Sequence, residues 1–333
     1  MATIDILIPT YNGSKCLRDT IYSILSQSYR DFRIIICDDA SKDDTLKVVN
    51  QIKDPRIDII KNDKNLGYSI NLERARQFAT AEFIYLMGQD DIMAQDTLKN
   101  TLKAFNLSPN IGAVTRPYFW FDKDINTPVR AKKQLSQKKD VIVKITDNSK
   151  KVIRVFQTLD QLSGLAYRRS FMKLPFHPDI FPCHIYPFAD IFKNHPVVFL
   201  KDFNIAVRIA SSQTRSLSSI YTKSPLLSWV EMVKSVYHEK KYQKIKKYLI
   251  KDFITKNYVG LVQLRNYAKY RYFIREIWYL IKYNWTNLFQ PSFWFFSLGC
   301  ILTPASILIP LVDWYKNKIY SQSLKIIIFH YNT

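Results

Sequence analysis

The chain has 333 residues, of which 47% are apolar, and it carries a formal net charge of +21. This length exceeds what a single hydrophobic core usually serves, so one large domain with an appended region is expected. The apolar content excludes an intrinsically disordered chain, and the presence of only seven glycines excludes collagen-like and glycine-rich repeats.

Positive charge is concentrated in the second half of the chain. Residues 1–150 hold 23 lysines and arginines against 19 acidic residues, whereas residues 151–333 hold 26 against 9. This asymmetry predicts an anionic partner for the second half, either a membrane surface or a nucleic acid. The four cysteines and five histidines are scattered without CxxC or HExxH spacing, so neither a disulfide framework nor a zinc site is expected, and a reducing compartment fits.

The first 115 residues alternate between short apolar runs and helical patterns. The runs predict strands at 4–8, 32–37, 57–60, 83–87 and 111–115. Helices are expected at 14–28, after the acidic pair 43–44, from Ser69 as a capping residue, and around 98–105. The order predicts an α/β fold with a parallel sheet and helices on both faces, in which ligands bind at the carboxyl ends of the strands.

Polar segments follow the first four predicted strands. They read PTYNG at 9–13, DDASKDDT at 38–45, NDKNLG at 62–67 and GQDD at 88–91. Neither GxGxxG nor GxxxxGK[ST] occurs, so the common dinucleotide and Walker-type phosphate loops are absent. Adjacent carboxylates such as Asp90 and Asp91 suit Mg²⁺ or Mn²⁺, and the Tyr11 ring can stack on a base. One acidic pair often only opens a turn, but two pairs at two strand ends favour a nucleotide site whose phosphates are held by a metal.

Four of these segments resemble, in order and spacing, the successive motifs of the family-2 inverting glycosyltransferases of the GT-A fold. They are IDILIPTYN at 4–12, DDASKDDT at 38–45, NLGYSIN at 65–71 and FIYLMGQDD at 83–91. The resemblance extends over roughly residues 3–215. It implies a GT-A, Rossmann-like nucleotide-diphospho-sugar transferase domain of the kind that builds bacterial surface polysaccharides.

The resemblance also implies roles for individual residues. A nucleotide-sugar pocket would be formed by Pro9, Thr10, Tyr11, Asn12, Asp38, Asp39, Asn65, Gly67, Asn71, Asp90 and Arg208. Within it, Asp39 would read the base edge and Arg208 would face the diphosphate. Asp90 and Asp91 would contact ribose and a divalent metal, with either of them as the direct ligand. Many members carry a further acid where this chain has Gly88, and a histidine where it has Ala210.

Inverting transfer needs one carboxylate to take the proton of the acceptor hydroxyl. In the family this base lies downstream of the metal motif, at the start of a helix, and the segment PFADIF at 187–192 fits. Asp190 is therefore the candidate base, Asp179 is its rival, and a helix cap is the alternative role for Asp190. Gly164 resembles a position where the backbone approaches closely near the acceptor.

The transferase domain is expected at 1–220, followed by a helical, basic and aromatic region at 221–333. Residues 223–282 hold 14 basic against 4 acidic residues, and residues 293–312 carry no charge but include two prolines. Three interpretations of 293–312 stay open: a membrane-embedded or interfacial anchor, a buried helix hairpin, and a single membrane span. The basic helices favour anionic lipid headgroups, and no nucleic-acid reader motif is present, so no nucleic-acid partner is expected.

These features predict an inverting, metal-dependent glycosyltransferase that uses Mn²⁺ or Mg²⁺. It would move a sugar from a nucleotide-diphosphate sugar to a glycan acceptor, lipid-linked, at the cytoplasmic face of the cell membrane. Two alternatives stay open. One is a catalytically degenerate GT-A-fold nucleotide-binding protein, motivated by Gly88, and the other is a basic scaffold that binds membranes or nucleic acids.

Overall fold

The computed structural model describes residues 2–209, 218–324 and 326–331, and the chain divides into two compact units. Unit 1 comprises Met1–Ala210 together with Leu324–Thr333, and unit 2 comprises Ser211–Ser323. The sequence places the whole of 221–333 in the helical region, whereas in the structure the last residues belong to unit 1.

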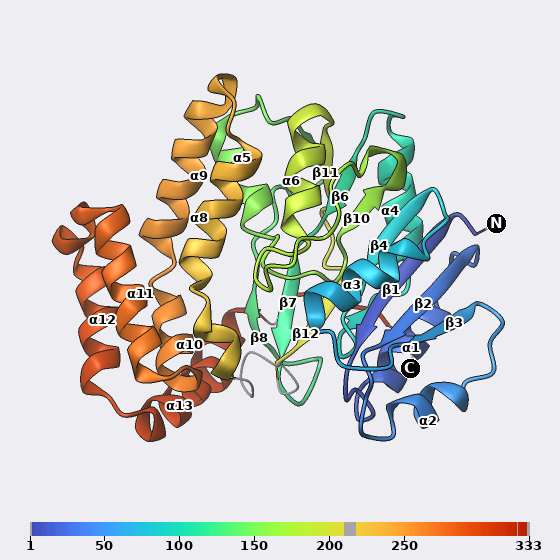
Figure 1. Cartoon of the computed structure of the whole chain (residues 1–333), viewed down its shortest axis with the longest axis horizontal. Coiled ribbons are helices and arrows are strands. Elements are labelled where there is room, and N and C mark those ends of the chain that lie inside the picture. The colour runs from blue at the N-terminus through green and yellow to red at the C-terminus, as the bar shows by residue number, and fades with distance from the viewer. Residues whose placement is uncertain (1, 210–217, 325, 332–333) are drawn as a thin grey trace. The chain divides into compact units, whose positions relative to one another are not determined.

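Unit 1 is built on an eight-stranded sheet in the order β3-β2-β1-β4-β10-β6-β11-β9 (Figure 1). Its strands are β1 (Ile4–Thr10), β2 (Phe32–Asp38), β3 (Ile57–Lys61), β4 (Phe83–Leu86), β6 (Ala113–Thr115), β9 (Val141–Val143), β10 (Ala166–Arg168) and β11 (Val197–Phe199). Strands β3, β2, β1 and β4 run parallel, and the β1–β2 register extends from Ile4 opposite Phe32 to Thr10 opposite Asp38. The residues of β1 and β4 are all buried, which explains why these strands appear in the sequence as continuous apolar runs.

The expectation of a wholly parallel sheet is wrong beyond β4. Strand β10 lies between β4 and β6 and is antiparallel to both. The fifth predicted strand, β6, is therefore not the neighbour of the fourth. A three-residue strand such as β10 has no periodicity that a sequence pattern can detect.

The helices of unit 1 are α1 (Leu17–Leu25), α2 (Thr45–Asn50), α3 (Tyr68–Gln77), α4 (Thr97–Asn106), α5 (Ser149–Phe156) and α6 (Ile185–Asn194). Four of them, α1 to α4, lie where the apolar periodicity predicts them, whereas α5 was not predicted and the helix at α6 was expected only from the family resemblance. Helix α1 buries Leu17, Ile21 and Ile24 in the same core as the strands β1 and β2. Ser69 is not a capping residue, because α3 already begins at Tyr68 and the Ser69 hydroxyl donates to the carbonyl of Pro178 (2.8 Å).

A second, four-stranded sheet in unit 1 has the order β5-β12-β7-β8 and was not predicted. Its strands are β5 (Ile92–Met93), β7 (Tyr118–Phe121), β8 (Pro128–Ala131) and β12 (Ile205–Arg208). The C-terminal segment 326–331 packs against this sheet, with the Phe329 ring edge-on to Phe119 at 5.1 Å between centroids. The backbone N–H of Gln95 also donates to the carbonyl of His330 (2.9 Å). The last described residues thus support the sheet that carries Arg208.

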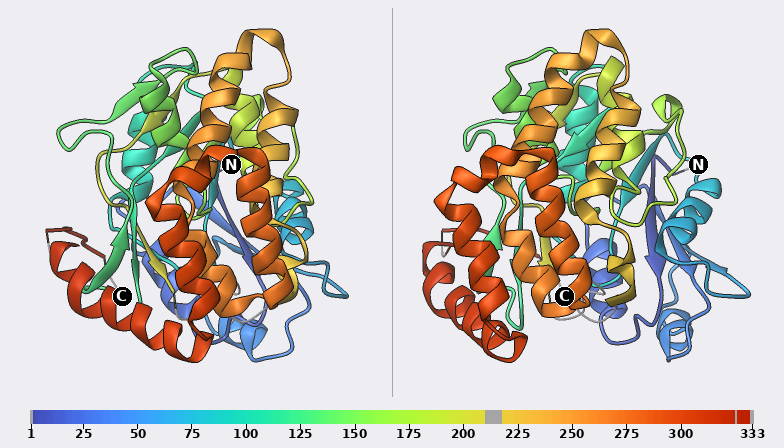
Figure 2. Two further views of the ribbon diagram at one scale, coloured as in Figure 1. Left: turned by 90° about the vertical axis from the view of Figure 1, so that its left-hand side faces the viewer. Right: turned by 60° about the vertical axis from the view of Figure 1, so that its left-hand side comes forward.

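Unit 2 is helical in the residues that the structure describes. Its helices are α8 (Pro225–Val236), α9 (Gln243–Lys256), α10 (Val259–Tyr267), α11 (Tyr270–Tyr283), α12 (Pro291–Leu302) and α13 (Ala305–Trp314). Helix α10 contacts α11, α12 and α13 (Figure 2). The buried Glu276 of α11 accepts from the backbone N–H of Leu226 (2.8 Å) at the start of α8, and burial raises the pKa of this carboxyl.

The uncharged segment 293–312 forms two short helices, α12 and α13, rather than one continuous helix. They are separated at Thr303 and Pro304, where proline cannot continue the helix from the preceding turn. Over residues 2–209, 218–324 and 326–331, none of the helices has both the length and the apolar character that crossing a bilayer requires.

Candidate active site

The loops at the carboxyl ends of β1, β2 and β4 are joined by hydrogen bonds into one surface. The backbone N–H of Asn12 donates to Ser41 Oγ (2.9 Å), and its Oδ1 accepts from the backbone N–H of Lys42 (2.8 Å). The N–H of Gly13 donates to Thr45 Oγ1 (2.8 Å). The segments 9–13 and 38–45, which the sequence singles out separately, therefore form one site.

Gln89 connects this surface to the loop after β4, and sequence reasoning missed it. Its Oε1 accepts from the backbone N–H of Tyr11 (2.9 Å), and its Nε2 donates to the carbonyl of Tyr11 (3.2 Å). A Cβ on Gly13 would lie 2.6 Å from Gln89 Oε1, so a side chain at position 13 would displace the Gln89 amide. Gln89 lies inside the GQDD motif, but only the contact across 78 residues gives it a role.

Asp38 and Asp39 are both buried at the end of β2, and both carboxylates bond to the protein itself. Asp39 accepts from the side chain of Asn62 (2.9 Å) and from the backbone N–H groups of Leu66 and Gly67 (2.8 Å each). Asp38 accepts from the backbone and the hydroxyl of Ser41. Asp39 therefore positions the 62–67 loop, and its reading of a base edge stays a prediction.

The side-chain amide of Asn71 fixes the segment 65–71 to the rest of the fold. Its amide Nδ2 donates to the carbonyl of Cys37 (2.8 Å), and its Oδ1 accepts from Asn62 (2.9 Å), so both ends of the buried amide are used inside the fold. Gly67 has φ of +86°, and a Cβ added there would meet no atom within 4 Å, so backbone conformation rather than space favours glycine. Asn65 is exposed on this loop, and Pro9 and Thr10 are buried at the end of β1.

Asp91 is buried directly before β5 and has three donors around its carboxylate. Oδ1 accepts from the backbone N–H of Arg208 (3.0 Å), and Oδ2 accepts from the hydroxyl of Ser163 and from Gln161 Nε2 (3.4 Å). Burial and the neighbouring Asp90 raise the pKa of Asp91 to about 8. A cation beside this carboxyl would favour its ionised form.

Gly88 leaves open a space on which both carboxylates converge. A Cβ on Gly88 would lie 2.9 Å from Asp91 Oδ2, 3.1 Å from Ser163 Oγ and 3.3 Å from Asp90 Oδ1. Oxygen donors of this kind are the ligands of Mg²⁺ and Mn²⁺, which take one or two carboxylates and complete their shell with substrate phosphates. In the described part of the chain no group of three or more acidic, histidine or cysteine side chains forms a metal cluster, so the pair of carboxylates is what the chain offers.

Arg208 lies beside the two acids, and its facing of a diphosphate stays a prediction. Its Nε donates to the carbonyl of Asp90 (3.2 Å), and its guanidinium pairs with the exposed Asp19 (3.1 Å) and lies over the ring of Phe121. Strand β12 thus brings Arg208 to the loop after β4, 117 residues away from Asp91 in the chain. Ala210, the position of the family's histidine, lies outside the described residues.

A buried arginine, Arg116, holds the loop that carries Gln161 and Ser163, and no sequence motif points to it. Its guanidinium donates to the carbonyls of Thr158 (3.2 Å), Gln161 (2.9 Å) and Ser163, while its Nε has no hydrogen-bond partner. Gly164 has φ of +89°, and a Cβ there would lie 2.5 Å from Arg116 Nε. The close backbone approach expected at Gly164 is therefore an approach to Arg116.

Asp190 lies in the middle of α6, not at its start, so the helix-cap alternative is wrong. Its carboxylate pairs with Lys193 Nζ (2.9 Å), and both side chains are largely buried. The residue before α6, His184, bonds through Nε2 to the carbonyl of Leu159, which lies on the loop that contacts Asp91. The rival Asp179 is buried and accepts from the backbone N–H of Phe181 (3.3 Å).

Residues 5–160 match the sequence profile described as "Glycosyl transferase family 2". The chain therefore carries a glycosyl transferase family 2 domain. Its matched range begins within β1, contains β2, β3 and β4, and includes the acids Asp39, Asp90 and Asp91. The resemblance seen in the four sequence motifs is thereby confirmed.

Relatives of this family 2 domain include named bacterial enzymes. The chain is 36% identical over 102 residues to the Escherichia coli UDP-Glc:alpha-D-GlcNAc-diphosphoundecaprenol beta-1,3-glucosyltransferase WfaP, covering 31% of this chain and 41% of that enzyme. It is 28% identical over 102 residues to the Bacillus subtilis putative teichuronic acid biosynthesis glycosyltransferase TuaG, covering 30% and 40%. The chain thus spans about two fifths of the length of these relatives.

Solved structures share the fold over nearly the whole chain. S. aureus TarS 1-349 in complex with UDP superimposes with a TM-score of 0.62 at 15% identity, covering 98% of this chain and 90% of that chain. The Pyrobaculum calidifontis mannosyltransferase PcManGT, in complex with GDP-Man and Mn²⁺, gives a TM-score of 0.55 at 15% identity, covering 97% and 87%. The predicted fold class, a GT-A-like α/β domain followed by helices, is confirmed.

Proposed function

We propose that this protein transfers a sugar, with inversion, from a nucleotide-diphosphate sugar to a lipid-linked glycan acceptor in cell-surface polysaccharide synthesis. The observation that carries the proposal is the single surface at the carboxyl ends of β1, β2 and β4. There a family 2 domain brings Asp39, Asp90 and Asp91 to one edge of the sheet.

The donor site would extend over this surface. Tyr11 follows β1 with its backbone fixed by Gln89, so its half-exposed ring is available to stack on a base. The TarS structures hold UDP and UDP-GlcNAc, and PcManGT holds GDP-Man, which supports a nucleoside-diphosphate sugar as the donor class. Arg208, which already lies beside Asp90, would face the diphosphate.

Asp90 and Asp91 would hold a divalent cation, Mn²⁺ or Mg²⁺, in the space that Gly88 leaves open. When bound, such a cation stabilises the charge that develops on a departing diphosphate. The chain's own part is to keep the two carboxylates converged, which Ser163 and the backbone N–H of Arg208 do for Asp91. The Mn²⁺ of PcManGT supports the choice of metal.

Asp190 would accept the proton of the acceptor hydroxyl as its oxygen attacks the anomeric carbon. One base is sufficient for a single displacement with inversion. Lys193, at 2.9 Å, holds this carboxylate in place on α6. The contact between His184 and Leu159 ties the start of that helix to the loop that contacts Asp91, which gives a structural route for aligning base and donor.

The names of the relatives support an acceptor class and a place of action. The name of WfaP states a diphosphoundecaprenol-linked acceptor, and TuaG is named for teichuronic acid biosynthesis. We therefore place this protein at an anionic membrane surface, on the cytoplasmic face where nucleotide sugars are made, with unit 1 as the transferase domain and the basic helices of unit 2 as the membrane-facing region.

The test is a panel of nucleotide sugars, each assayed with Mn²⁺ for thermal stabilisation and for release of the nucleoside diphosphate. One sugar should both stabilise the protein and turn over, and NMR of the product should show an inverted anomeric centre. Asp91→Asn should remove the effect of Mn²⁺, whereas Asp124→Asn, on an exposed turn, should leave it unchanged. Binding of a nucleotide sugar without any turnover would instead support the catalytically degenerate binding protein.

A further inference from the structure

The outward side of the α12–α13 helix pair is apolar. On α12, Phe295, Leu298 and Leu302 recur at the spacing of one helix face, and Phe295 and Leu302 are 73% and 77% exposed. On α13, Ile307, Leu311 and Trp314 recur in the same way, each more than half exposed. A surface helix in water presents polar residues on this side, so a face of this composition indicates a non-aqueous partner.

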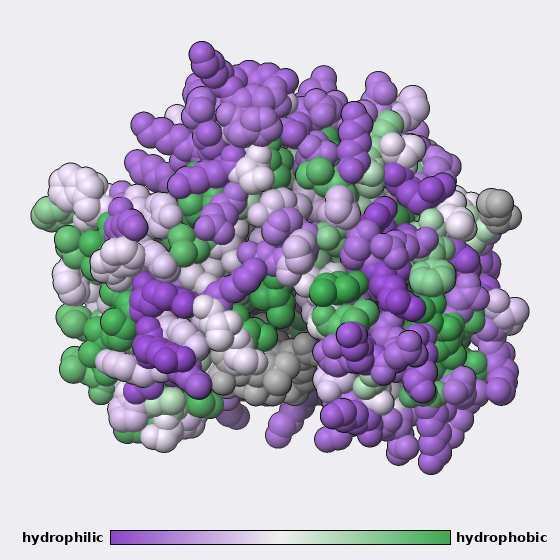
Figure 3. Space-filling view, in the orientation of Figure 1, coloured by the Kyte–Doolittle hydropathy of each residue, from purple (hydrophilic) through white to green (hydrophobic). Residues whose placement is uncertain are grey.

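The exposed apolar surface continues beyond the two helices. Trp285 and Phe289, in the short 3-10 helix η4 (Trp285–Phe289), are 65% and 72% exposed. No residue between Tyr283 and Val312 is charged. Figure 3 shows hydrophobic residues gathered over α12. Aromatic side chains at the border of such a surface are typical of a membrane interface.

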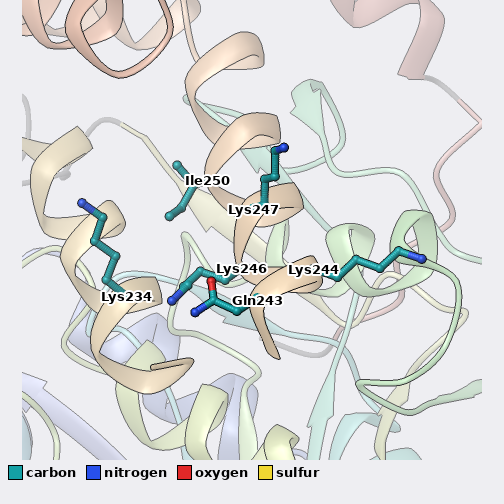
Figure 4. Close-up of a pocket in the computed structure, with 6 residues that line it drawn as sticks. All are labelled: Lys234, Gln243, Lys244, Lys246, Lys247 and Ile250. Atoms are coloured by element: carbon teal, nitrogen blue, oxygen red, sulfur yellow. The ribbon is translucent and has the colours of Figure 1, made fainter. Parts of the chain in front are cut away.

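The charges around this segment are mostly positive, and further lysines lie elsewhere in unit 2. Lys282 precedes the segment, and one acid, Asp313, and two lysines, Lys316 and Lys318, follow it. A hollow of about 700 Å³ between α8 and α9 is lined by Lys234, Gln243, Lys244, Lys246, Lys247 and Ile250, none of them acidic (Figure 4). In Figure 4 Lys234 comes from one helix and the other three lysines from the next. Charge of this sign is complementary to anionic lipid headgroups.

The lengths of the two helices decide how they can meet a bilayer. Helix α12 has 12 residues and α13 has 10, which at about 1.5 Å per residue gives roughly 18 and 15 Å. The hydrocarbon core is about 30 Å thick, so neither helix reaches across it. Each is long enough to lie in the interface with its apolar side about 5–10 Å below the headgroups.

We propose that the α12–α13 pair with η4 inserts into one leaflet of an anionic membrane, and that the lysines of unit 2 bind the surrounding headgroups. The occupant of the apolar face is thus lipid, not a second copy of the chain. This inference rests on the proposed function, because insertion would hold the transferase domain where a lipid-linked acceptor is accessible.

The experiment is flotation of the full chain with vesicles of phosphatidylcholine alone or of phosphatidylcholine and phosphatidylglycerol at 7:3. The wild type should float with the mixed vesicles, and the triple variant Phe295→Glu, Leu302→Glu, Leu311→Glu should lose at least about tenfold in binding. The matched control is Leu107→Glu with Ile142→Glu, two exposed apolar residues of unit 1, which should float as the wild type does. Equal thermal unfolding of all three proteins excludes misfolding as the cause.

Three results would overturn the inference. They are undiminished flotation of the triple variant, equal flotation with both kinds of vesicle, and a wild-type dimer in sedimentation velocity that the triple variant breaks. Release of nucleoside diphosphate, measured without vesicles, tests the proposed function separately from membrane insertion. The triple variant should release it at the wild-type rate, and if no protein releases it, flotation still decides the membrane inference.

Discussion

Replacing Arg116 by methionine tests how the carboxylates of the site are held in position. Arg116 is 1% exposed, and its guanidinium donates to three carbonyls of the 158–163 loop. That loop supplies Ser163 and Gln161 to Asp91. Methionine fills a similar length without donors, so the substitution removes the hydrogen bonds and leaves the carbonyls buried.

The cost can be worked from these contacts. A buried carbonyl left without a donor costs about 1–3 kcal/mol, and removing one partner of a buried charged network typically costs about 3–5 kcal/mol in all. For a domain of 150–250 residues, 1 kcal/mol shifts the melting temperature by about 2–4 °C. We therefore expect Arg116→Met to lower the melting temperature of unit 1 by roughly 10 °C and to raise the metal concentration needed for half-maximal activity.

The assay is thermal unfolding followed by titration of Mn²⁺ against release of nucleoside diphosphate. Arg130→Met is the matched control, because Arg130 is exposed in the neighbouring strand and its guanidinium lies over the Trp120 ring at 3.5 Å. It should change the melting temperature by no more than about 2 °C. If Arg116→Met melts within 2 °C of the wild type and responds to Mn²⁺ as the wild type does, Arg116 does not position the loop.

The remaining predictions concern other parts of unit 1. Asp190→Asn should lower kcat by about 100- to 10,000-fold while donor affinity, measured by calorimetry, stays within a few-fold, and a loss of donor affinity would remove Asp190 from the role of base. Burial lowers the pKa of His184 to about 4 from 6.5, so the folded state binds this proton less readily than the unfolded state. Stability is then fully present above pH 6.5 and falls by roughly 3 kcal/mol as the pH drops towards 4. Urea unfolding at pH 7 and pH 4.5 should show a smaller loss for His184→Gln than for the wild type, and equal losses would contradict the assignment. Phe329→Ala should raise the donor KM several-fold by loosening the β5-β12-β7-β8 sheet, and an unchanged KM would show that the segment 326–331 is not needed for the site.

Much of the first half of unit 1 could be predicted because its central strands are buried on both faces. The continuous apolar runs at β1, β2 and β4 are typical of buried parallel strands. The rule that ligands bind at the carboxyl ends of such strands then identified Asp39, Asp90 and Asp91 as candidates. Strand β10 could not be predicted in the same way, because three residues carry no period. The small sheet was missed because β5 has only two residues and because the sheet pairs segments that lie far apart in the chain.

The residues that support the site could not be predicted from the sequence, because their roles depend on contacts between distant parts of the chain. Gln89 and Arg116 have no motif of their own and act through contacts with residues 78 and 42–47 positions away. Asp190 could be named from its segment, but its place in the middle of α6 and its pairing with Lys193 depend on where that helix begins. Local pattern identifies the chemistry of a side chain, whereas its partners are set by the folded topology.

Segment 326–331 belongs to unit 1 and packs against its small sheet. Unit 2 is therefore an insertion in the sequence of unit 1, between β12 and segment 326–331. This means that a truncation made to remove the helices takes away the packing beneath Phe119 and the sheet of Arg208 at the same time. Loss of activity in a truncated protein would therefore indicate damage to the sheet of Arg208 as readily as loss of the proposed membrane contact.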